Sequence, residues 1–570
     1  MFSSVHDKKN YLYINKLKKY HNLTLSILSG LLLISSWPTS PLTFLVFFAW
    51  VPLLILSERT NRIRFYLYSL LTLFIWNAGT TWWIWNATAG GAIGAIILNA
   101  WLMCIPLWAY YIIKNKFGNT AGYTSFIVFW MSFEYIHLNW QLSWPWLTLG
   151  NIFATQPDWV QWYEYTGTSG GTLWVLVVNL LIFLLLKTFY QSRSGDGVIQ
   201  DASGTKRQLV KLGSAALACI VLPLIISGFV ERSTEQPQKQ ATGVEPDNVI
   251  VVQPNIDPYN EKFQNGSVEG QIQKLVALSE AELDSNTKLV IWPETAVPVA
   301  VAEDAIGGNM YFKPVFEFAQ RHPNVTLLTG IESYRNYGSE QLSRTARKLE
   351  DGYFDFFNAA VYIKNNTPYQ FYHKSKLVPG VETLPDFLLW LGPIFEKFGG
   401  TTGGYGHDKE AAVFSSAANP YVAAPIICYE SIYGEYVASY VRKGATLLTI
   451  ITNDGWWFNT PGHRQHLYYA RLRAIETRRW VARSANTGIS AVIDEKGHLL
   501  ATKLWDEAAS IKFNIPAFTG QTFFVRYGDV ISPLMLLIAG ILLLWHWVTA
   551  LRDYLQQRAL RRQGSPARSA

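Results

Sequence analysis

The sequence predicts a polytopic α-helical membrane domain joined to an α/β domain that lies outside the membrane. The chain has 570 residues, and 15% aromatic against only 16% charged residues is unlike a soluble enzyme of this size. Apolar segments near bilayer length fill the first 230 residues and recur near the C-terminus. Between them, short apolar strands alternate with amphipathic helices, which is typical of an α/β sandwich.

About eight apolar segments are candidate transmembrane helices. They are 23–37, 41–57, 65–85, 91–113, 122–138, 173–187, 212–230 and 530–550. A basic segment precedes the first of them, as in a signal peptide. Because no small-x-small cleavage site follows and further apolar segments come directly after it, we expect a retained helix.

Basic residues indicate how the helices are oriented. Lys and Arg occur in every second connection: the N-terminal segment, 59–64, 114–116, 187–211 and the tail from 552. The loops 38–41, 86–90 and 138–172 contain neither. Since Lys and Arg favour the cytoplasmic side, both termini are expected in the cytoplasm, and the large polar region in the periplasm of a Gram-negative cell. The net charge of +7 comes mainly from these basic connections and termini, a distribution that indicates membrane topology, so no nucleic-acid partner is expected.

The expected division of the chain follows from these segments. Residues 1–230 form the membrane domain, 231–247 a linker, 248–515 the external domain, and 516–570 a second linker, the last span and a basic cytoplasmic tail. Strands are expected near 248–255, 286–293, 324–332, 355–364, 367–375, 421–428, 445–452 and 488–494. Helices are expected near 267–283, 311–322, 430–443 and 461–484. The outside segment 139–172 is rich in Trp and Tyr, which predicts either an interfacial belt or a role in shaping a substrate site.

Three expected strands end in residues suited to nucleophilic catalysis. Cys428 stands at a strand-to-helix turn, where backbone N–H groups favour a thiolate. Glu294 and Lys374 end two other apolar strands. A carboxylate can take the thiol proton, and an ammonium can stabilise the oxyanion that forms on the way to a thioester. Each residue alone also has a structural interpretation: a small buried cysteine, a turn cap and a surface charge.

The other two cysteines, Cys104 and Cys219, fall in apolar segments, so no disulfide framework is expected.

The order strand-Glu, strand-Lys, strand-Cys resembles the nitrilase superfamily. The resemblance implies an αββα sandwich with Glu294, Lys374 and Cys428 as the catalytic triad. Lys376 is a rival for Lys374, but the catalytic lysine of that superfamily precedes x-x-Leu-Val-Pro, and here this selects Lys374. The segments 453–457, 465–467, 473–476 and 483–490 fit the same resemblance.

The membrane segments narrow the resemblance to the apolipoprotein N-acyltransferase family. The matching motifs are Trp292-Pro293-Glu294-Thr295-Ala296, Leu377-Val378-Pro379 with Glu382, Cys428-Tyr429-Glu430, Gly520-x-Thr522 and Arg526-x-Gly528-Asp529. The resemblance implies a bacterial inner-membrane enzyme that moves an acyl chain from a membrane phospholipid, through a Cys428 thioester, to the α-amino group of a diacylglyceryl-cysteine apolipoprotein. No cofactor and a monomer are expected.

Further residues receive supporting roles from the resemblance. Glu382 and Glu430 would orient the lysine or the incoming amine, while Tyr429 and Trp456 would either line the substrate pocket or pack structurally. The glycine-rich stretch Gly399–Gly406 is expected to be a loop or lid near the site.

Other patterns concern metal and membrane chemistry. His463 and His466 stand three apart but have no evident third ligand, so structural histidines rather than a metal site are expected. Glu134 is the one acidic residue inside an expected span.

Two other functions remain open at this point. One is a membrane-tethered amidase or nitrilase that hydrolyses small C–N substrates. The other is a catalytically inactive lipid-binding or transport protein, against which stands the scarcity of charge within the expected spans.

Overall fold

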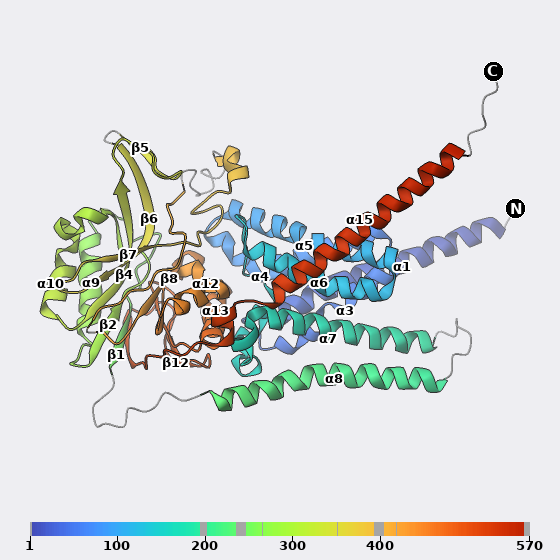
Figure 1. The fold of residues 1–570 in the computed structure, drawn as a ribbon, viewed down its shortest axis with the longest axis horizontal. Coiled ribbons are helices and arrows are strands. Elements are labelled where there is room, and N and C mark those ends of the chain that lie inside the picture. Colours follow the sequence, from blue (N-terminus) through green and yellow to red (C-terminus); the bar gives the residue numbers. More distant parts are fainter. Residues whose placement is uncertain are drawn as a thin grey trace, which may run out of the picture.

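The computed structural model describes residues 3–193, 202–234, 247–264, 266–349, 352–392, 404–417 and 419–563. Long helices run side by side and meet a two-sheet sandwich at one end (Figure 1). The N-terminal end of the first helix and the C-terminal end of the last lie far from the sandwich (Figure 1). This is the arrangement expected when both ends of the chain lie on the membrane side opposite the external domain.

Helices occupy every predicted membrane segment. They are α1 Ser3–Ser36, α2 Val46–Ala49, α3 Val51–Arg59, α4 Arg62–Thr81, α5 Ala89–Phe117, α6 Asn119–Leu138, α7 Tyr163–Arg193, α8 Ala202–Ser233 and α15 Ile531–Gln563. Within the described residues, four helical stretches are long and apolar enough to cross a membrane: Ala89–Phe117, Tyr163–Ser192, Ser203–Ser233 and Ile531–Leu560. The remaining predicted spans coincide with helices, and their crossing of the membrane stays a prediction.

The outer helices expose apolar side chains. Leu217 and Phe229 on α8, and Leu537 and Trp547 on α15, are each more than half exposed. Such surfaces are stable against lipid rather than water, which agrees with a membrane domain. Inside the bundle, Trp50 packs edge-on against Trp130 with ring centroids 4.4 Å apart.

The buried Glu134 joins three parts of the bundle. Its Oε1 accepts hydrogen bonds from Trp130 Nε1 and from the backbone N–H of Leu149, both at 2.9 Å, and its Oε2 accepts from Thr172 Oγ1 at 2.7 Å. These donors lie on α6, on the 3₁₀ segment Leu149–Thr155 and on α7. The carboxylate therefore ties the segment 139–172 to the helices that flank it.

The external domain is a sandwich of two sheets. One has the order β13-β1-β2-β4-β6-β5, with β3 beside β4 and β7 beside β6, and the other has the order β12-β11-β10-β9-β8. The first sheet comprises β1 Asn248–Gln253, β2 Thr287–Ile291, β3 Val297–Ala302, β4 Thr326–Asn336, β5 Arg347–Leu349, β6 Gly352–Ile363, β7 Gln370–His373 and β13 Ala509–Asn514. The second comprises β8 Ala423–Ile427, β9 Leu447–Thr452, β10 Val481–Ala485, β11 Ser490–Ile493 and β12 Leu499–Lys503.

The central strands are parallel and almost wholly apolar because both of their faces are covered. Helices α9 Val268–Glu280 and α10 Lys313–Arg321 pack on the first sheet. Helices α12 Gly434–Arg442 and α13 Pro461–Thr477 pack on the second. The predicted αββα sandwich is confirmed.

Two predicted helices differ from the structure. The helix expected over 461–484 ends at Thr477, where Arg478 takes a left-handed backbone conformation with φ +49°, and β10 follows. No glycine or proline marks this end, so the sequence pattern runs on unbroken. The helix expected from 430 begins only at Gly434, after a 3₁₀ turn over Cys428–Ile432. Strands β3, β5, β10, β12 and β13 were not predicted.

A continuous apolar core joins the bundle to the sandwich. Trp146 is buried, packs edge-on against Tyr469 of α13 with centroids 5.4 Å apart, and donates to Gln465 Oε1 at 2.7 Å. Trp37 Nε1 donates to the hydroxyl of Tyr469 at 3.0 Å. Trp146 in the aromatic segment thus forms a contact between domains, which neither interpretation of its sequence anticipated.

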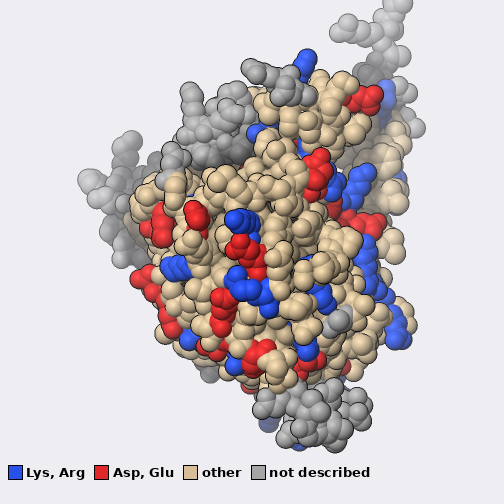
Figure 2. Space-filling view, turned by 90° about the vertical axis from the view of Figure 1, so that its left-hand side faces the viewer, with Lys and Arg blue, Asp and Glu red and all other residues tan. Residues whose placement is uncertain are grey.

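The outer end of the sandwich carries mixed charge. Figure 2 shows Lys and Arg interspersed with Asp and Glu over this face, without a large area of one sign. Residues 235–246 of the predicted linker and 399–403 of the glycine-rich stretch lie outside the described residues.

Candidate active site

Cys428 stands on a strained turn directly after β8. Its φ of +50° lies in the left-handed region, which side-chain-bearing residues seldom adopt. Burial raises the pKa of its thiol well above the ordinary value, the negative charge of Glu294 raises it further, and Lys374 opposes both. At rest the sulfur is therefore protonated, and a base must take its proton before attack.

Glu430 holds this turn in place. Its Oε2 accepts from the backbone N–H of Ile427 at 2.9 Å, and its Oε1 accepts from the N–H of Ser375 at 2.7 Å and from Tyr372 OH at 2.6 Å. The carboxylate thereby connects the end of β8 to the segment that follows β7. The structure thus gives Glu430 a role in positioning the backbone around Cys428 and Lys374.

Lys374 lies between two carboxylates. Its Nζ is 2.8 Å from Glu382 Oε1 and 3.3 Å from Glu294 Oε1. Burial lowers the pKa of the ammonium, but the negative charges of Glu382 and Glu294 outweigh this and raise it well above the ordinary value. Lys374 is therefore a fixed positive charge beside Cys428.

Two residues at this site were missed by sequence reasoning. Asn358 on β6 donates through Nδ2 to Glu294 Oε1 at 2.8 Å and to Glu382 Oε1 at 3.1 Å. Lys262 donates to the carbonyl of Glu294 at 3.2 Å and to Thr295 Oγ1 at 2.7 Å. In the sequence, Asn358 stands out as an amide residue within an apolar strand, whereas no sequence pattern marks Lys262 as a site residue.

A buried ionic network supports the carbonyl of Cys428. His466 Nε2 lies 3.1 Å from that oxygen, and His466 Nδ1 lies 2.9 Å from Asp454 Oδ1. Asp454 also pairs with Arg483, and although burial alone would raise the pKa of this carboxyl, the charges of Arg483 and His466 hold it far below its usual range. Both nitrogens of His466 are thus occupied, while His463 contacts Asn459 at 3.2 Å.

Tyr429 and Trp456 occupy different surroundings. Tyr429 is buried, and its hydroxyl donates to the carbonyl of Ser143 in the membrane domain at 3.0 Å. Trp456 packs against Tyr259 and Phe263, with ring centroids 5.3 and 6.3 Å away. Tyr429 therefore belongs to the contact between domains, and Trp456 to an aromatic group at its edge.

An apolar cavity of about 390 Å³ lies between the membrane domain and the segment that carries Glu382. Leu98 and Leu102 of α5 line one side, and Val378, Leu384 and Leu388 line the other. Its walls are mostly hydrocarbon, so it suits an alkyl chain better than a small polar amide.

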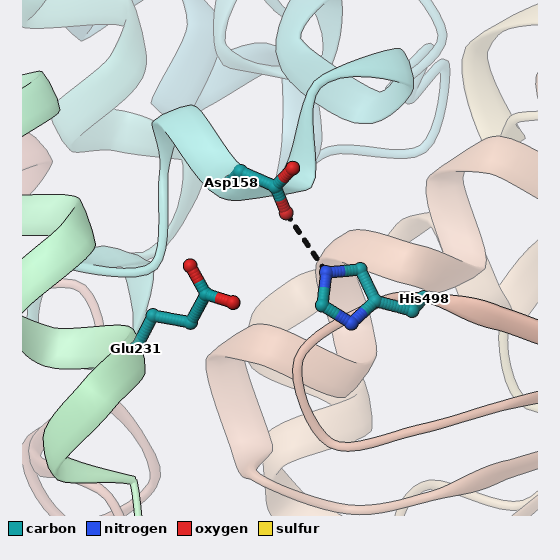
Figure 3. A group of neighbouring side chains, drawn as sticks. All are labelled: Asp158, Glu231 and His498. Carbon is teal, nitrogen blue, oxygen red and sulfur yellow. Dashed lines mark hydrogen bonds and ion pairs between the residues drawn. The ribbon is translucent and has the colours of Figure 1, made fainter.

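A further group of possible metal ligands lies away from the triad. Asp158, Glu231 and His498 come together near the end of α8 (Figure 3). His498 Nε2 is 2.8 Å from Asp158 Oδ1 and Nδ1 is 3.2 Å from Asp494 Oδ2; the hydrogen bond to Asp494 is the main cause that raises the imidazole pKa to about 9. His498 and Asp158 therefore form an ion pair between the two domains.

Comparison with known proteins agrees with this architecture. Residues 29–181 match the model of the apolipoprotein N-acyltransferase N-terminal domain, and residues 248–520 match that of carbon-nitrogen hydrolases. An apolipoprotein N-acyltransferase of Chlorobaculum tepidum is 30% identical over 533 residues, which cover 91% of this chain and 95% of that protein. One of Geobacter metallireducens is 25% identical over 525 residues, covering 89% and 92%.

An amidase of the nitrilase superfamily from Nesterenkonia aligns with 50% of this chain and 95% of its own, at 15% identity and a TM-score of 0.33. This distant likeness adds nothing to the assignment. The similarity to the Chlorobaculum enzyme extends over both domains, and the two family models cover the membrane part and the sandwich in turn. The chain belongs to the apolipoprotein N-acyltransferase family.

Proposed function

We propose that this protein transfers an acyl chain from a membrane phospholipid to the α-amino group of an apolipoprotein's N-terminal diacylglyceryl-cysteine, through a thioester on Cys428. The observation that carries the proposal is the link between the buried Glu-Lys-Cys group and an apolar cavity that adjoins the membrane helices: Val378 lines the cavity and donates to Glu382, the partner of Lys374. An acyl chain in that cavity would bring its ester carbonyl toward Cys428 without leaving an apolar environment.

The first half-reaction forms the acyl-enzyme. Glu294 accepts the thiol proton while the Cys428 sulfur attacks the ester carbonyl, and Lys374 stabilises the negative charge that develops on the carbonyl oxygen. Collapse of the tetrahedral intermediate breaks the ester C–O bond. Glu294 then returns the proton to the departing lysophospholipid oxygen, which leaves a thioester on Cys428.

The second half-reaction consumes the thioester. The neutral α-amino group attacks the thioester carbonyl, Glu294 accepts a proton from the attacking nitrogen, and the C–S bond breaks. The same proton passes to the Cys428 sulfur, so the thiol and an amide-linked acyl chain are the products. Glu382 keeps Lys374 charged and oriented through both steps.

The proposed location is the bacterial inner membrane, with a periplasmic sandwich, cytoplasmic termini and a monomeric chain. Its support is the alternation of basic loops and the exposure of apolar residues on α8 and α15.

Mass spectrometry of purified protein given a phospholipid with a labelled acyl chain tests the proposal. We expect a hydroxylamine-labile label on Cys428 that a diacylglyceryl-cysteine peptide discharges. Cys428→Ala and Glu294→Gln should carry none. Absence of an adduct, together with release of ammonia from small amides, would replace the proposal with a tethered amidase.

A further inference from the structure

A second cavity, of about 470 Å³, lies where the sandwich meets the outer ends of the membrane helices. Tyr135 and Asn139 line it from the end of α6, and Asp529 lines it just before α15. Lys376, the lysine that competed with Lys374 in the sequence, also lines it. Its Nζ lies 5.5 Å and 5.3 Å from the ring centroids of Tyr433 and Tyr436.

Two basic residues that line this cavity are paired with carboxylates, and Asp529 is held by neutral donors. Lys443 pairs with Glu410 at 2.7 Å, and Arg442 pairs with Glu435 at 2.8 Å. Asp529 Oδ1 accepts from Ser169 Oγ at 2.8 Å and from two backbone N–H groups at the start of α15.

Lys376 and Lys409 differ from these residues. Considering only the described part of the chain, neither has a carboxylate within 4.0 Å. Burial lowers the pKa of Lys376, and the negative charge of Glu430 opposes this only in part, so holding the ammonium charge in this half-buried position costs free energy. An anion bound in the cavity would offset this unfavourable free energy by pairing with the ammonium.

We call this second cavity the polar cavity, after the charged residues that line it, and it adjoins the apolar cavity. Ser143 lines the apolar cavity, Tyr433 lines the polar cavity, and the Ser143 hydroxyl is 2.7 Å from that of Tyr433. A molecule with an alkyl chain on one side of this bridge and an anionic group on the other would fill both. In the proposed orientation, the ends of the bundle helices near the sandwich (Figure 1) lie at the level of the lipid headgroups.

We propose that the polar cavity binds the phosphodiester of a glycerophospholipid whose acyl chain occupies the apolar cavity, with Lys376 as the main anion-binding residue and Lys409 as a second. The proposal rests on the proposed function for the identity of the lipid, and it deepens that function by naming the site of the headgroup. A charge-assisted hydrogen bond to phosphate provides orientation as well as affinity.

A binding experiment without chemistry tests the proposal. The full-length protein in detergent is titrated by native mass spectrometry with a short-chain phosphatidylglycerol whose chains are ether-linked, so that no acyl group can be transferred. The matched dialkylglycerol lacks the phosphate, and inorganic phosphate serves as the free anion. The variants are Lys376→Gln, Lys376→Arg and, as a control, Lys348→Gln, which changes an exposed lysine outside the cavity.

We expect Lys376→Gln to weaken phosphatidylglycerol binding about tenfold, equivalent to about 1.4 kcal/mol. Lys376→Arg and Lys348→Gln should bind within twofold of the parent, and binding of the dialkylglycerol should not change. Equal binding of phosphatidylglycerol by Lys376→Gln and Lys348→Gln would overturn the proposal. So would equal weakening of both lipids, or binding of inorganic phosphate as tight as that of the lipid.

The labelling of Cys428 by an ester-linked phospholipid is measured separately. We expect Lys376→Gln to need a higher concentration of the ester-linked phospholipid for half-maximal labelling, whereas Lys348→Gln should be labelled like the parent. Failure of the parent protein to become labelled would count against the proposed function alone.

Discussion

The ammonium of Lys374 lies closer to Glu382, at 2.8 Å, than to Glu294, at 3.3 Å. Glu382 also accepts from the backbone N–H of Val378 at 2.8 Å, so its carboxylate is fixed at both oxygens. Because Glu382 compensates Lys374 most directly, the proposed mechanism leaves Glu294 to exchange a proton with Cys428. In the proposed mechanism the two carboxylates beside Lys374 therefore have different roles.

Replacement of Glu382 by Gln tests this division. The change removes the nearer negative charge from a buried ammonium, so we expect Cys428 acylation to slow by about 10- to 100-fold, or about 1.4 to 2.8 kcal/mol. The rate is measured as the appearance of labelled Cys428 under single-turnover conditions. Glu340→Gln, at an exposed position, is the matched control. An unchanged rate would show that Glu294 alone is enough to compensate the positive charge of Lys374.

The buried Lys262 predicts a pH dependence of stability. Burial outweighs the attraction of Glu294 and lowers the Lys262 pKa from 10.5 to about 7. Between these values the unfolded chain binds the proton and the folded chain does not, so this residue makes stability rise with pH, by at most about 1.4 kcal/mol per pH unit. Below about pH 7 both states are protonated, and the slope disappears.

Melting temperatures in detergent, measured from pH 6 to 9, check this expectation. The melting temperature of the parent should rise relative to that of Lys262→Met as the pH rises above 7, because the parent progressively loses its buried charge. A difference independent of pH would contradict a lowered pKa for Lys262.

Gln465 joins the two domains through four hydrogen bonds. Its Oε1 accepts from Trp146 Nε1 at 2.7 Å and Trp83 Nε1 at 3.2 Å, and its Nε2 donates to the carbonyls of Pro38 at 2.8 Å and Thr80 at 3.3 Å. Gln465→Leu would leave these groups buried without this partner. We expect a loss of about 2 kcal/mol in stability, seen as a lower melting temperature.

Gln320→Leu, on the exposed face of α10, should leave the melting temperature nearly unchanged. If both variants melt like the parent, the contact between the domains does not depend on Gln465.

We expect replacement of Glu134 to lower the stability of the protein rather than its catalytic activity. Glu134→Gln replaces one acceptor oxygen with an NH₂ group that faces a donor, so we expect a stability loss of about 1–3 kcal/mol. Activity per folded molecule should stay within about twofold of the parent. Labelling of Cys428 at low temperature, normalised to the folded fraction, measures this. A well-folded but inactive Glu134→Gln protein would instead reveal a functional role.

Much of the fold was readable from the sequence because its signals are local. The apolar stretch of α5 and the buried strands β1 and β9 are continuous runs whose length and composition select helix or strand. The end of α13 at Thr477 was not readable, since a left-handed Arg478 carries no local signature. Packing of β10 between β9 and β11 decides it.

For the candidate site, too, some features could be predicted from the sequence and others could not. The sequence by itself determined the fold class, the family resemblance and the positions of Glu294, Lys374 and Cys428, because each follows a strand whose pattern is local. Only the tertiary structure decided that Asn358 joins Glu294 to Glu382, that Glu430 holds the Cys428 turn, and that Lys376, unlike Lys374, lines the second cavity. Those relationships depend on hydrogen bonds and charges brought together from distant segments, and such contacts leave no periodic trace in the chain.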